Sequence, residues 1–274
     1  MEFKHVSIMV PEIIEALNIK PDGTYADGTA GGGGHSLAIG QHLSDAGIMI
    51  CNDRDADALA ACKERLKDLT CNLRLIRGTF SDLAENAAVP FDGVLLDLGV
   101  SSYQLDCAER GFSYMHDAPL DMRMNRDDSL SAKEVVNEWS ESELTRIFFE
   151  YGEERFSSRI ASNIIRARHT APIETTGELV EIIKRSVPAR HGDGGHHPAM
   201  RTFQALRIEV NAELDVIAPA IKSAVSLLNK GGRIAIITFH SLEDRIVKQT
   251  FASLTGGCTC PKSFPVCVCG NKPK

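Results

Sequence analysis

The stretch that decides the fold is Tyr25-Ala26-Asp27-Gly28-Thr29-Ala30-Gly31-Gly32-Gly33-Gly34-His35-Ser36. A short apolar run ends at Asp27, four consecutive glycines follow, and a helical pattern begins at Ser36. Because glycine lacks a Cβ, its backbone can turn through positive φ and lie directly against a ligand. A helix that starts behind such a loop offers unpaired N–H groups and a positive dipole end. The stretch therefore predicts a strand, a ligand-binding glycine loop and a helix, although glycine clusters also occur in plain turns.

Alternating strands and helices surround this loop. Apolar runs typical of strands lie at residues 25–27, 48–53, 73–76 and 91–97, with helical patterns at 36–43 and 55–66. Strands that are separated by helices indicate βαβ units and a parallel sheet. The second run ends in Asp53, roughly twenty residues after the glycines, where nucleoside-binding folds place an acid that accepts from the ribose.

A helical block interrupts this pattern between the fourth and fifth strands. Helices are expected at residues 141–151, 155–168, 176–186 and 201–214, and residues 227–239 are expected to form a helix end, a Gly-Gly turn and a buried strand. The predicted class is α/β, with a Rossmann-like sheet that carries an inserted helical domain. We expect one domain to comprise residues 1–105 and 215–274, and the other residues 106–214. The last strands of such a sheet are expected to be missing from the chain.

The composition is that of an ordinary globular protein, with 274 residues and 43% apolar residues. No apolar run is long enough to cross a bilayer, and the N-terminus lacks a signal-peptide pattern, so a cytoplasmic protein without a membrane partner is expected. The net charge of -7 argues against nonspecific coating of nucleic acid. Four cysteines among apolar neighbours are expected to be reduced thiols: Cys51, Cys62, Cys71 and Cys107.

The residues around the loop narrow the choice of cofactor. The Gly-Lys-Ser/Thr ending of an ATPase phosphate loop is absent, and Asp27 would repel a pyrophosphate. A ligand with an ammonium group fits better, and S-adenosylmethionine has an ammonium, a ribose diol and an adenine. We expect Asp27 to attract the ammonium, directly or through water, and Asp53 to accept from the ribose hydroxyls.

Two further segments follow strands at the same expected sheet edge. Asp97-Leu98-Gly99-Val100 ends the fourth strand, where an acceptor can orient a target amine, although Asp and Gly also favour turns. His240, after the fifth strand, is expected either to contact substrate or to cap the next helix, and both alternatives stay open.

No metal site is predicted from the remaining motifs. The segment His191–Pro198 is glycine-rich and is expected to be a substrate-facing loop rather than a zinc site. The cysteines at 258, 260, 267 and 269 are expected to be ordinary thiols, with a thiolate metal site as the alternative. The helical block is also rich in basic residues, and either a solvated face or an RNA-backbone patch explains them: Arg155, Arg159, Arg166, Arg168, Lys184, Arg185, Arg190, Arg201 and Arg207.

Together these residues resemble the bacterial small-subunit ribosomal RNA (cytosine-N4) methyltransferase family, RsmH, formerly MraW. The blocks that carry the resemblance are residues 5–9, 27–36, 53–55, 96–102, 104–106, 109–113, 119–124, 151–156, 201–208 and 239–245. They include Arg201-Thr202-Phe203-Gln204-Ala205-Leu206-Arg207-Ile208 and Phe239-His240-Ser241-Leu242-Glu243-Asp244-Arg245. Members of this family usually have a further terminal segment beyond the position where this chain ends.

The resemblance implies a class I methyltransferase that uses S-adenosylmethionine to methylate N4 of a cytidine in the decoding centre of 16S ribosomal RNA, within the small subunit. It also implies cofactor contacts at Gly33, Gly34, His35, Asp53, Phe80, Asp97 and Gln104, with Asp97 as the catalytic residue. Two alternatives remain: a non-catalytic cofactor-binding ribosome assembly factor, and a DNA amino-methyltransferase, whose usual Pro-Pro-aromatic loop is absent here. The oligomeric state is open, and a homodimer is one option.

Overall fold

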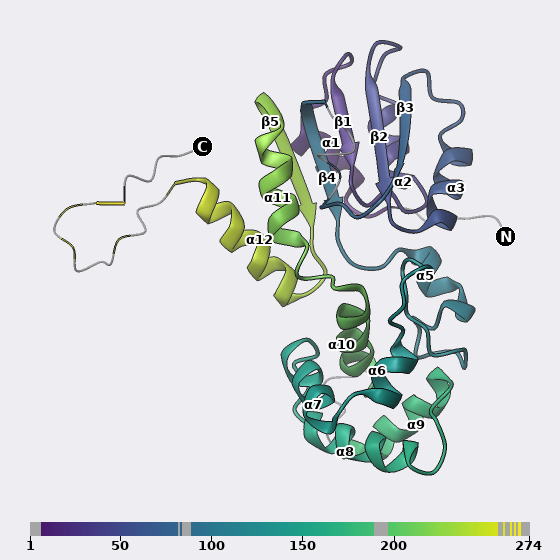
Figure 1. Cartoon of the computed structure of the whole chain (residues 1–274). Coiled ribbons are helices and arrows are strands. Elements are labelled where there is room, and N and C mark those ends of the chain that lie inside the picture. Colours follow the sequence, from purple (N-terminus) through teal and green to yellow (C-terminus); the bar gives the residue numbers. More distant parts are fainter. Residues whose placement is uncertain are drawn as a thin grey trace. The chain divides into compact units, whose positions relative to one another are not determined.

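The structure is a computed structural model that describes residues 7–81, 83, 89–188, 197–256, 260, 264, 266, 268 and 269. The chain forms two compact units, which are described separately below (Figure 1). The sheet unit comprises Met1–Gly99 with Leu214–Lys274, and the helical unit comprises Val100–Glu213. Among the described residues, no helix is both long and apolar enough to span a bilayer.

The sheet unit contains a five-stranded parallel sheet with strand order β3-β2-β1-β4-β5. The strands are β1 (Thr24–Asp27), β2 (Ile48–Asp53), β3 (Asn72–Arg77), β4 (Phe91–Asp97) and β5 (Leu228–Ile237). The predicted α/β class and parallel sheet are thus confirmed. The strand order reverses between β1 and β4, and open parallel sheets bind their ligands at the carboxyl ends of the strands beside such a switch point. Both β1 and β4 end there in an aspartate, Asp27 and Asp97.

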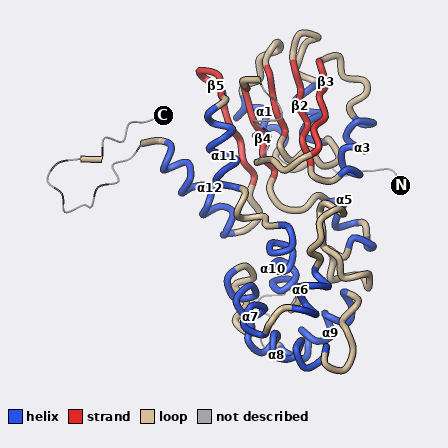
Figure 2. Tube along the Cα trace, viewed as in Figure 1, coloured by secondary structure: helices blue, strands red, loops and turns tan. Residues whose placement is uncertain are grey.

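Helices lie along the sheet (Figure 2), and their apolar side chains join those of the strands in two clusters. One apolar cluster includes residues of α1 (Val10–Leu17), α2 (Gly34–Gly40) and α3 (Ala56–Arg65), and the other includes residues of α11 (Ile217–Ser226) and α12 (Ser241–Leu254). Successive strand residues alternate between the clusters: Met49 and Cys51 belong to the first and Ile50 to the second. Cys51, Cys62 and Cys71 are buried free thiols and Cys107 is a half-buried one, as expected.

The start of β5 differs from the prediction. Gly231 and Gly232 were expected to form a turn before the strand, but both lie inside β5, where the pairing with β4 is irregular. Phe91 pairs with Leu228, whereas Gly93 pairs with Arg233, so β5 contains extra residues between these pairs. Gly231 has φ +82°, and a Cβ on Gly232 would lie 3.0 Å from the carbonyl oxygen of Phe91. The glycines therefore accommodate a bulge, which sequence patterns do not distinguish from a turn.

In the helical unit the described elements are all helices, with one isolated bridge between Pro119 and Thr175. They are α5 (Ser102–Asp106), η1 (Ala108–Arg110), α6 (Ala132–Glu138), α7 (Glu141–Glu150), α8 (Ser157–Arg168), α9 (Thr176–Ser186) and α10 (Met200–Asn211). Capping boxes start α6, α7 and α9, at Ser131, Ser140 and Thr175. The unit has an apolar core of its own, which includes Phe148, Ile160 and Leu206.

Candidate active site

The glycine loop joins β1 to α2, and its backbone has the positive φ angles that its sequence predicts. Gly31 has φ +50° and Gly33 has φ +79°, both in the left-handed region that favours glycine. A Cβ on Gly33 would lie 3.1 Å from Sγ of Cys62 and 3.2 Å from its Cα, so a side chain at this position would press on α3. A Cβ on Gly34 would collide with Oγ of Ser7. The loop therefore needs glycine both for its conformation and for its close packing.

Asp27 braces this loop from inside. Its side chain is 1% exposed, and its two oxygens accept hydrogen bonds from the backbone N–H of Thr29 (3.1 Å) and the hydroxyl of Ser36 (2.7 Å). Burial raises the pKa of this carboxyl. Both oxygens of Asp27 thus bond within its own loop, and the expected contact with an ammonium, directly or through water, stays a prediction.

Asn52, which the sequence analysis did not single out, connects the loops that follow β1 and β3. Its side-chain amide nitrogen donates to the carbonyl oxygens of Gly28 and Gly78, each at 3.1 Å. The backbone carbonyl oxygen of Asn52 accepts from Ala30 N at 2.9 Å. The side chain is completely buried. A polar residue next to Asp53 in an otherwise apolar strand was the signal that could have identified it.

Asp53 lies at the end of β2 and contacts the glycine loop. Its Oδ2 accepts from Gly31 N at 2.8 Å, and its Oδ1 accepts from Asp55 N at 2.9 Å. Burial raises its pKa to about 6, against the opposing effect of these two hydrogen bonds. Each carboxylate oxygen can accept a second hydrogen bond, so Asp53 retains the capacity to receive two ligand hydroxyls.

His35 and Asp97 form a pair across the ends of α2 and β4. Nδ1 of His35 lies 3.5 Å from Oδ2 of Asp97, while Nε2 lies 2.8 Å from the carbonyl oxygen of Ile8. Because a carbonyl can only accept, Nε2 carries a proton and donates it to Ile8 O, while Nδ1 faces Asp97. The backbone N–H of Asp97 donates to Oγ1 of Thr29 at 2.6 Å, which connects this pair to the glycine loop.

The carboxyl of Asp97 is poised to titrate close to neutral pH. Burial and the nearby charges of Asp27 and Glu243 together raise its pKa to about 6, while His35 opposes the shift. Its Oδ1 is buried and has no hydrogen-bond partner within the described part of the chain. Leaving a buried acceptor without a donor costs free energy, so this atom is a candidate acceptor for a donor from a ligand or water.

The residues after β5 lie at the same edge of the sheet, since Asp97 is the register partner of Ile237. Glu243, at the third position of α12, is buried and accepts from the backbone N–H groups of Phe239 (2.8 Å) and His240 (3.4 Å). His240 is the N-cap residue of α12, and its Nε2 lies 3.2 Å from Oε1 of Glu243. The capping alternative for His240 thus agrees with its position, and substrate contact stays a prediction.

The other two predicted cofactor residues are Phe80 and Gln104. Phe80 is half-buried against the second apolar cluster, and its Cβ would lie 3.1 Å from a Cβ on Gly28. Gln104 belongs to the helical unit, where it is buried and its Oε1 accepts from Ser101 N at 3.1 Å. The sheet unit therefore contains Gly33, Gly34, His35, Asp53, Phe80 and Asp97.

The other motifs do not form a described metal centre. Residues 189–196, which hold most of the histidine loop, and the cysteines at 258 and 267 lie outside the described residues. His197 stacks on Tyr114 with ring centroids 4.7 Å apart, and its Nδ1 accepts from Ala199 N. Cys260 accepts a hydrogen bond from Val268 N through its sulfur.

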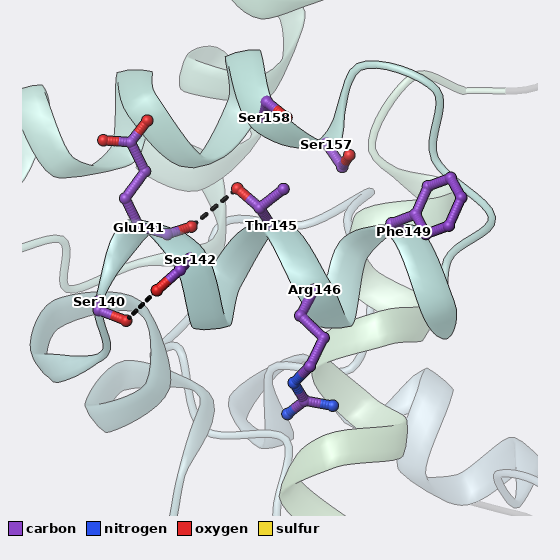
Figure 3. A pocket seen from close by; sticks show the side chains of 8 residues that line it. All are labelled: Ser140, Glu141, Ser142, Thr145, Arg146, Phe149, Ser157 and Ser158. Atoms are coloured by element: carbon purple, nitrogen blue, oxygen red, sulfur yellow. Dashed lines mark hydrogen bonds between the residues drawn. The ribbon is translucent and has the colours of Figure 1, made fainter.

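A separate pocket lies within the helical unit, between α7 and α8 (Figure 3). It is lined by Ser140, Glu141, Ser142, Thr145, Arg146, Phe149, Ser157 and Ser158. Arg146 is paired with Glu150 at 3.2 Å and with Glu209 at 3.7 Å, so its charge is largely balanced. The pocket lacks the paired buried acids of the sheet edge, and we assign it no chemistry.

Comparison with known proteins identifies the family. The family model described as "MraW methylase family" matches residues 2–274. The chain belongs to the MraW methylase family. It is 57% identical over 278 residues to Ribosomal RNA small subunit methyltransferase H of Clostridium botulinum (strain Loch Maree / Type A3), covering 100% of this chain and 89% of that protein.

A second sequence relative and one solved structure were also compared with this chain. Ribosomal RNA small subunit methyltransferase H 2 of Agathobacter rectalis is 53% identical over 279 residues, again over 100% of this chain and 89% of the relative. Among solved structures, an rRNA methylase from Streptococcus thermophilus matches 43% of this chain and 71% of its own, at 20% identity and a TM-score of 0.29. The family membership of this chain therefore rests on the sequence relatives.

Proposed function

We propose that this member of the MraW methylase family transfers a methyl group from S-adenosylmethionine to N4 of a cytidine in the decoding centre of 16S ribosomal RNA. Its close relatives bear the name of a small-subunit ribosomal RNA methyltransferase. The observation that carries the reaction type is Asp97, a half-buried carboxyl at the switch point of the sheet whose Oδ1 has no hydrogen-bond donor among the described residues. An exocyclic amine supplies such a donor.

The residues of the sheet unit fit S-adenosylmethionine. We assign the ribose hydroxyls to Asp53, the adenine to the side of Phe80, and the amino-acid end to the backbone of Gly33 and Gly34 at the start of α2. When bound, the cofactor supplies an electrophilic methyl group on a positively charged sulfur. Asp27 and Asp97 place negative charge behind this end of the loop, which favours a cation over a phosphate.

Asp97 orients the target amine in this proposal. The amine nitrogen of cytosine has its lone pair delocalised into the ring, so it is a poor nucleophile until that pair is localised. A hydrogen bond from the amine to Oδ1 of Asp97 fixes the nitrogen and directs its lone pair toward the methyl group. Asp97 would accept the proton that the amine loses on methylation, and Nδ1 of His35 lies 3.5 Å from the other oxygen of this carboxyl.

The helical unit, residues 106–214 in the sequence-based division, is proposed to bind the ribosomal RNA. Arg159 and Arg166 are exposed on α8, two helical turns apart on one face, and exposed Arg155 lies two residues before this helix. Arg168 and Arg207 have internal roles: Arg168 donates to Val136 O, and Arg207 forms two hydrogen bonds with Glu213. We therefore take Arg155, Arg159 and Arg166 as the centre of the proposed RNA-binding patch. Such a substrate places the enzyme in the cytoplasm.

The test is methyl transfer from labelled S-adenosylmethionine to purified small subunits that lack the modification, compared with protein-free 16S ribosomal RNA. The RNA is then digested, and the methylated nucleoside is identified by mass spectrometry. We expect label in N4-methylcytidine from the assembled subunits. Binding of cofactor without any transfer would support the non-catalytic assembly factor instead, and label in another nucleoside would remove the cytidine assignment.

A further inference from the structure

The turn between β5 and α12 presents an aromatic ring at the proposed reaction site. Phe239 is two residues beyond the end of β5, and its side chain is 58% exposed. The last register pair of β4 and β5 joins Asp97 to Ile237, so the ring follows the strand that neighbours the catalytic carboxyl. Isolated exposed apolar side chains are common, so the argument depends on what fixes this ring and what lies beside it.

The ring is next to a glycine of the β4 loop. A Cβ on Gly99 would lie 3.5 Å from Cδ2 of Phe239, and Gly99 has φ +93°, which side chains rarely adopt. Gly99 is two residues after Asp97 in the chain. One edge of Phe239 therefore lies beside the bare backbone of Gly99.

A buried carboxylate holds the backbone of this residue. Glu243 is 1% exposed, and its Oε2 accepts from the N–H of Phe239 at 2.8 Å. Its Oε1 would lie 3.9 Å from a Cβ on Gly99, so the same side chain reaches both segments. Burying a carboxylate is costly unless it is well paired. Here it fixes the backbone of Phe239, and with it the place from which the exposed ring projects.

We propose that Phe239 is the surface on which the target base stacks while its amine binds to Asp97. A base that undergoes chemistry must leave its own stack, and enzymes that act on it replace that stacking with an aromatic side chain. An exposed ring at the same sheet edge as the amine acceptor supplies this surface. The inference rests on the proposed methyl transfer and adds the residue that holds the base.

The test compares Phe239→Leu, which keeps an apolar side chain without a ring, with Phe239→Tyr, which keeps the ring. Loss of one base stack is expected to raise the KM for small subunits by roughly 5- to 150-fold in Phe239→Leu. Phe239→Tyr is expected to stay close to wild type. The dissociation constant for S-adenosylmethionine, measured by calorimetry, is expected to be unchanged in both variants. The control is Phe149→Leu, which removes another exposed phenylalanine, 65% exposed, in the helical unit.

Binding of the variants to small subunits separates this inference from the proposed reaction. Co-sedimentation in the presence of S-adenosylhomocysteine gives a dissociation constant without requiring any methyl transfer. We expect Phe239→Leu to weaken this binding and Phe239→Tyr to retain it, even if the wild-type protein proves to transfer no methyl group. Stacking is refuted if Phe239→Leu binds subunits as tightly as the wild type, or if the leucine and tyrosine variants are equally impaired. A matching loss of cofactor affinity in Phe239→Leu would also contradict it.

Discussion

Lowering the pH from 7.5 to 5.0 is expected to weaken S-adenosylmethionine binding through Asp53. Burial raises the pKa of this carboxyl to about 6 in the free protein. Both ribose hydroxyls need acceptors, and only the ionised carboxylate offers them on both oxygens. With a pKa of about 6, the ionised fraction falls from about 97% at pH 7.5 to about 9% at pH 5.0, so the dissociation constant should rise about tenfold.

The assay is isothermal calorimetry of S-adenosylmethionine binding at half-unit pH steps. Across most of this range the cofactor's own carboxylate and ammonium keep their charges, because they titrate near 3.5 and 8. The variant Asp53→Asn should bind more weakly at pH 7.5, by roughly tenfold or more, and should lose the dependence on pH. Asp97→Asn is the control, because it removes the other carboxyl with a pKa of about 6 and should leave the Asp53 effect in place. A flat profile in the wild type, or the same slope in Asp53→Asn, would refute the ribose assignment.

Further predictions concern the loop, the reaction and the RNA surface. Gly33→Ala is expected to lower the free energy of unfolding, measured in urea, by about 1–3 kcal/mol, because alanine at φ +79° is strained and its Cβ would press on Cys62. Gly32→Ala should change this free energy little, because its Cβ would lie 4.0 Å from the nearest atom. The kcat of the wild type is expected to fall as the pH drops below about 6, since protonated Asp97 cannot accept from the amine, and Asp97→Asn should lower kcat by roughly 100-fold or more at pH 7.5 while the circular dichroism spectrum stays native. Replacing Arg155, Arg159 and Arg166 together by alanine should reduce the slope of log affinity for small subunits against log salt by about 2–3, whereas Lys222→Ala, in the sheet unit, should leave the slope unchanged.

The elements of the sheet were predictable because their sequence patterns are local. The bounds predicted for β2 and β4, and for α9 in the helical unit, agree with the structure, since each has a clear period and flanking polar or turn residues. The bulge in β5 was not predictable, because Gly231 and Gly232 satisfy the pattern of a turn equally well. The choice depends on the carbonyl of Phe91 in the neighbouring strand, which no local pattern reveals.

The candidate site was predictable where residues follow strands, and not where they depend on partners distant in sequence. Asp53 and Asp97 were found because acids at strand ends are a known arrangement, and His35 entered with the family resemblance. For Asp27, the sequence indicates its place at the end of a strand. It does not indicate the hydrogen bonds that its side chain accepts from Ser36 and Thr29. The contact of Glu243 with the segment of Phe239 could not be predicted, because it depends on the three-dimensional structure.

The most direct test of the central claim is the nucleoside content of 16S ribosomal RNA in cells that lack this gene. Small subunits are purified, their RNA is digested, and N4-methylated cytidine is quantified by mass spectrometry. We predict that the modified nucleoside is lost in the deletion strain and returns with the wild-type gene, but not with Asp97→Asn expressed at the same level. An unchanged amount of the modified nucleoside in the deletion strain would contradict the proposed function. Full restoration by Asp97→Asn would contradict the role of Asp97.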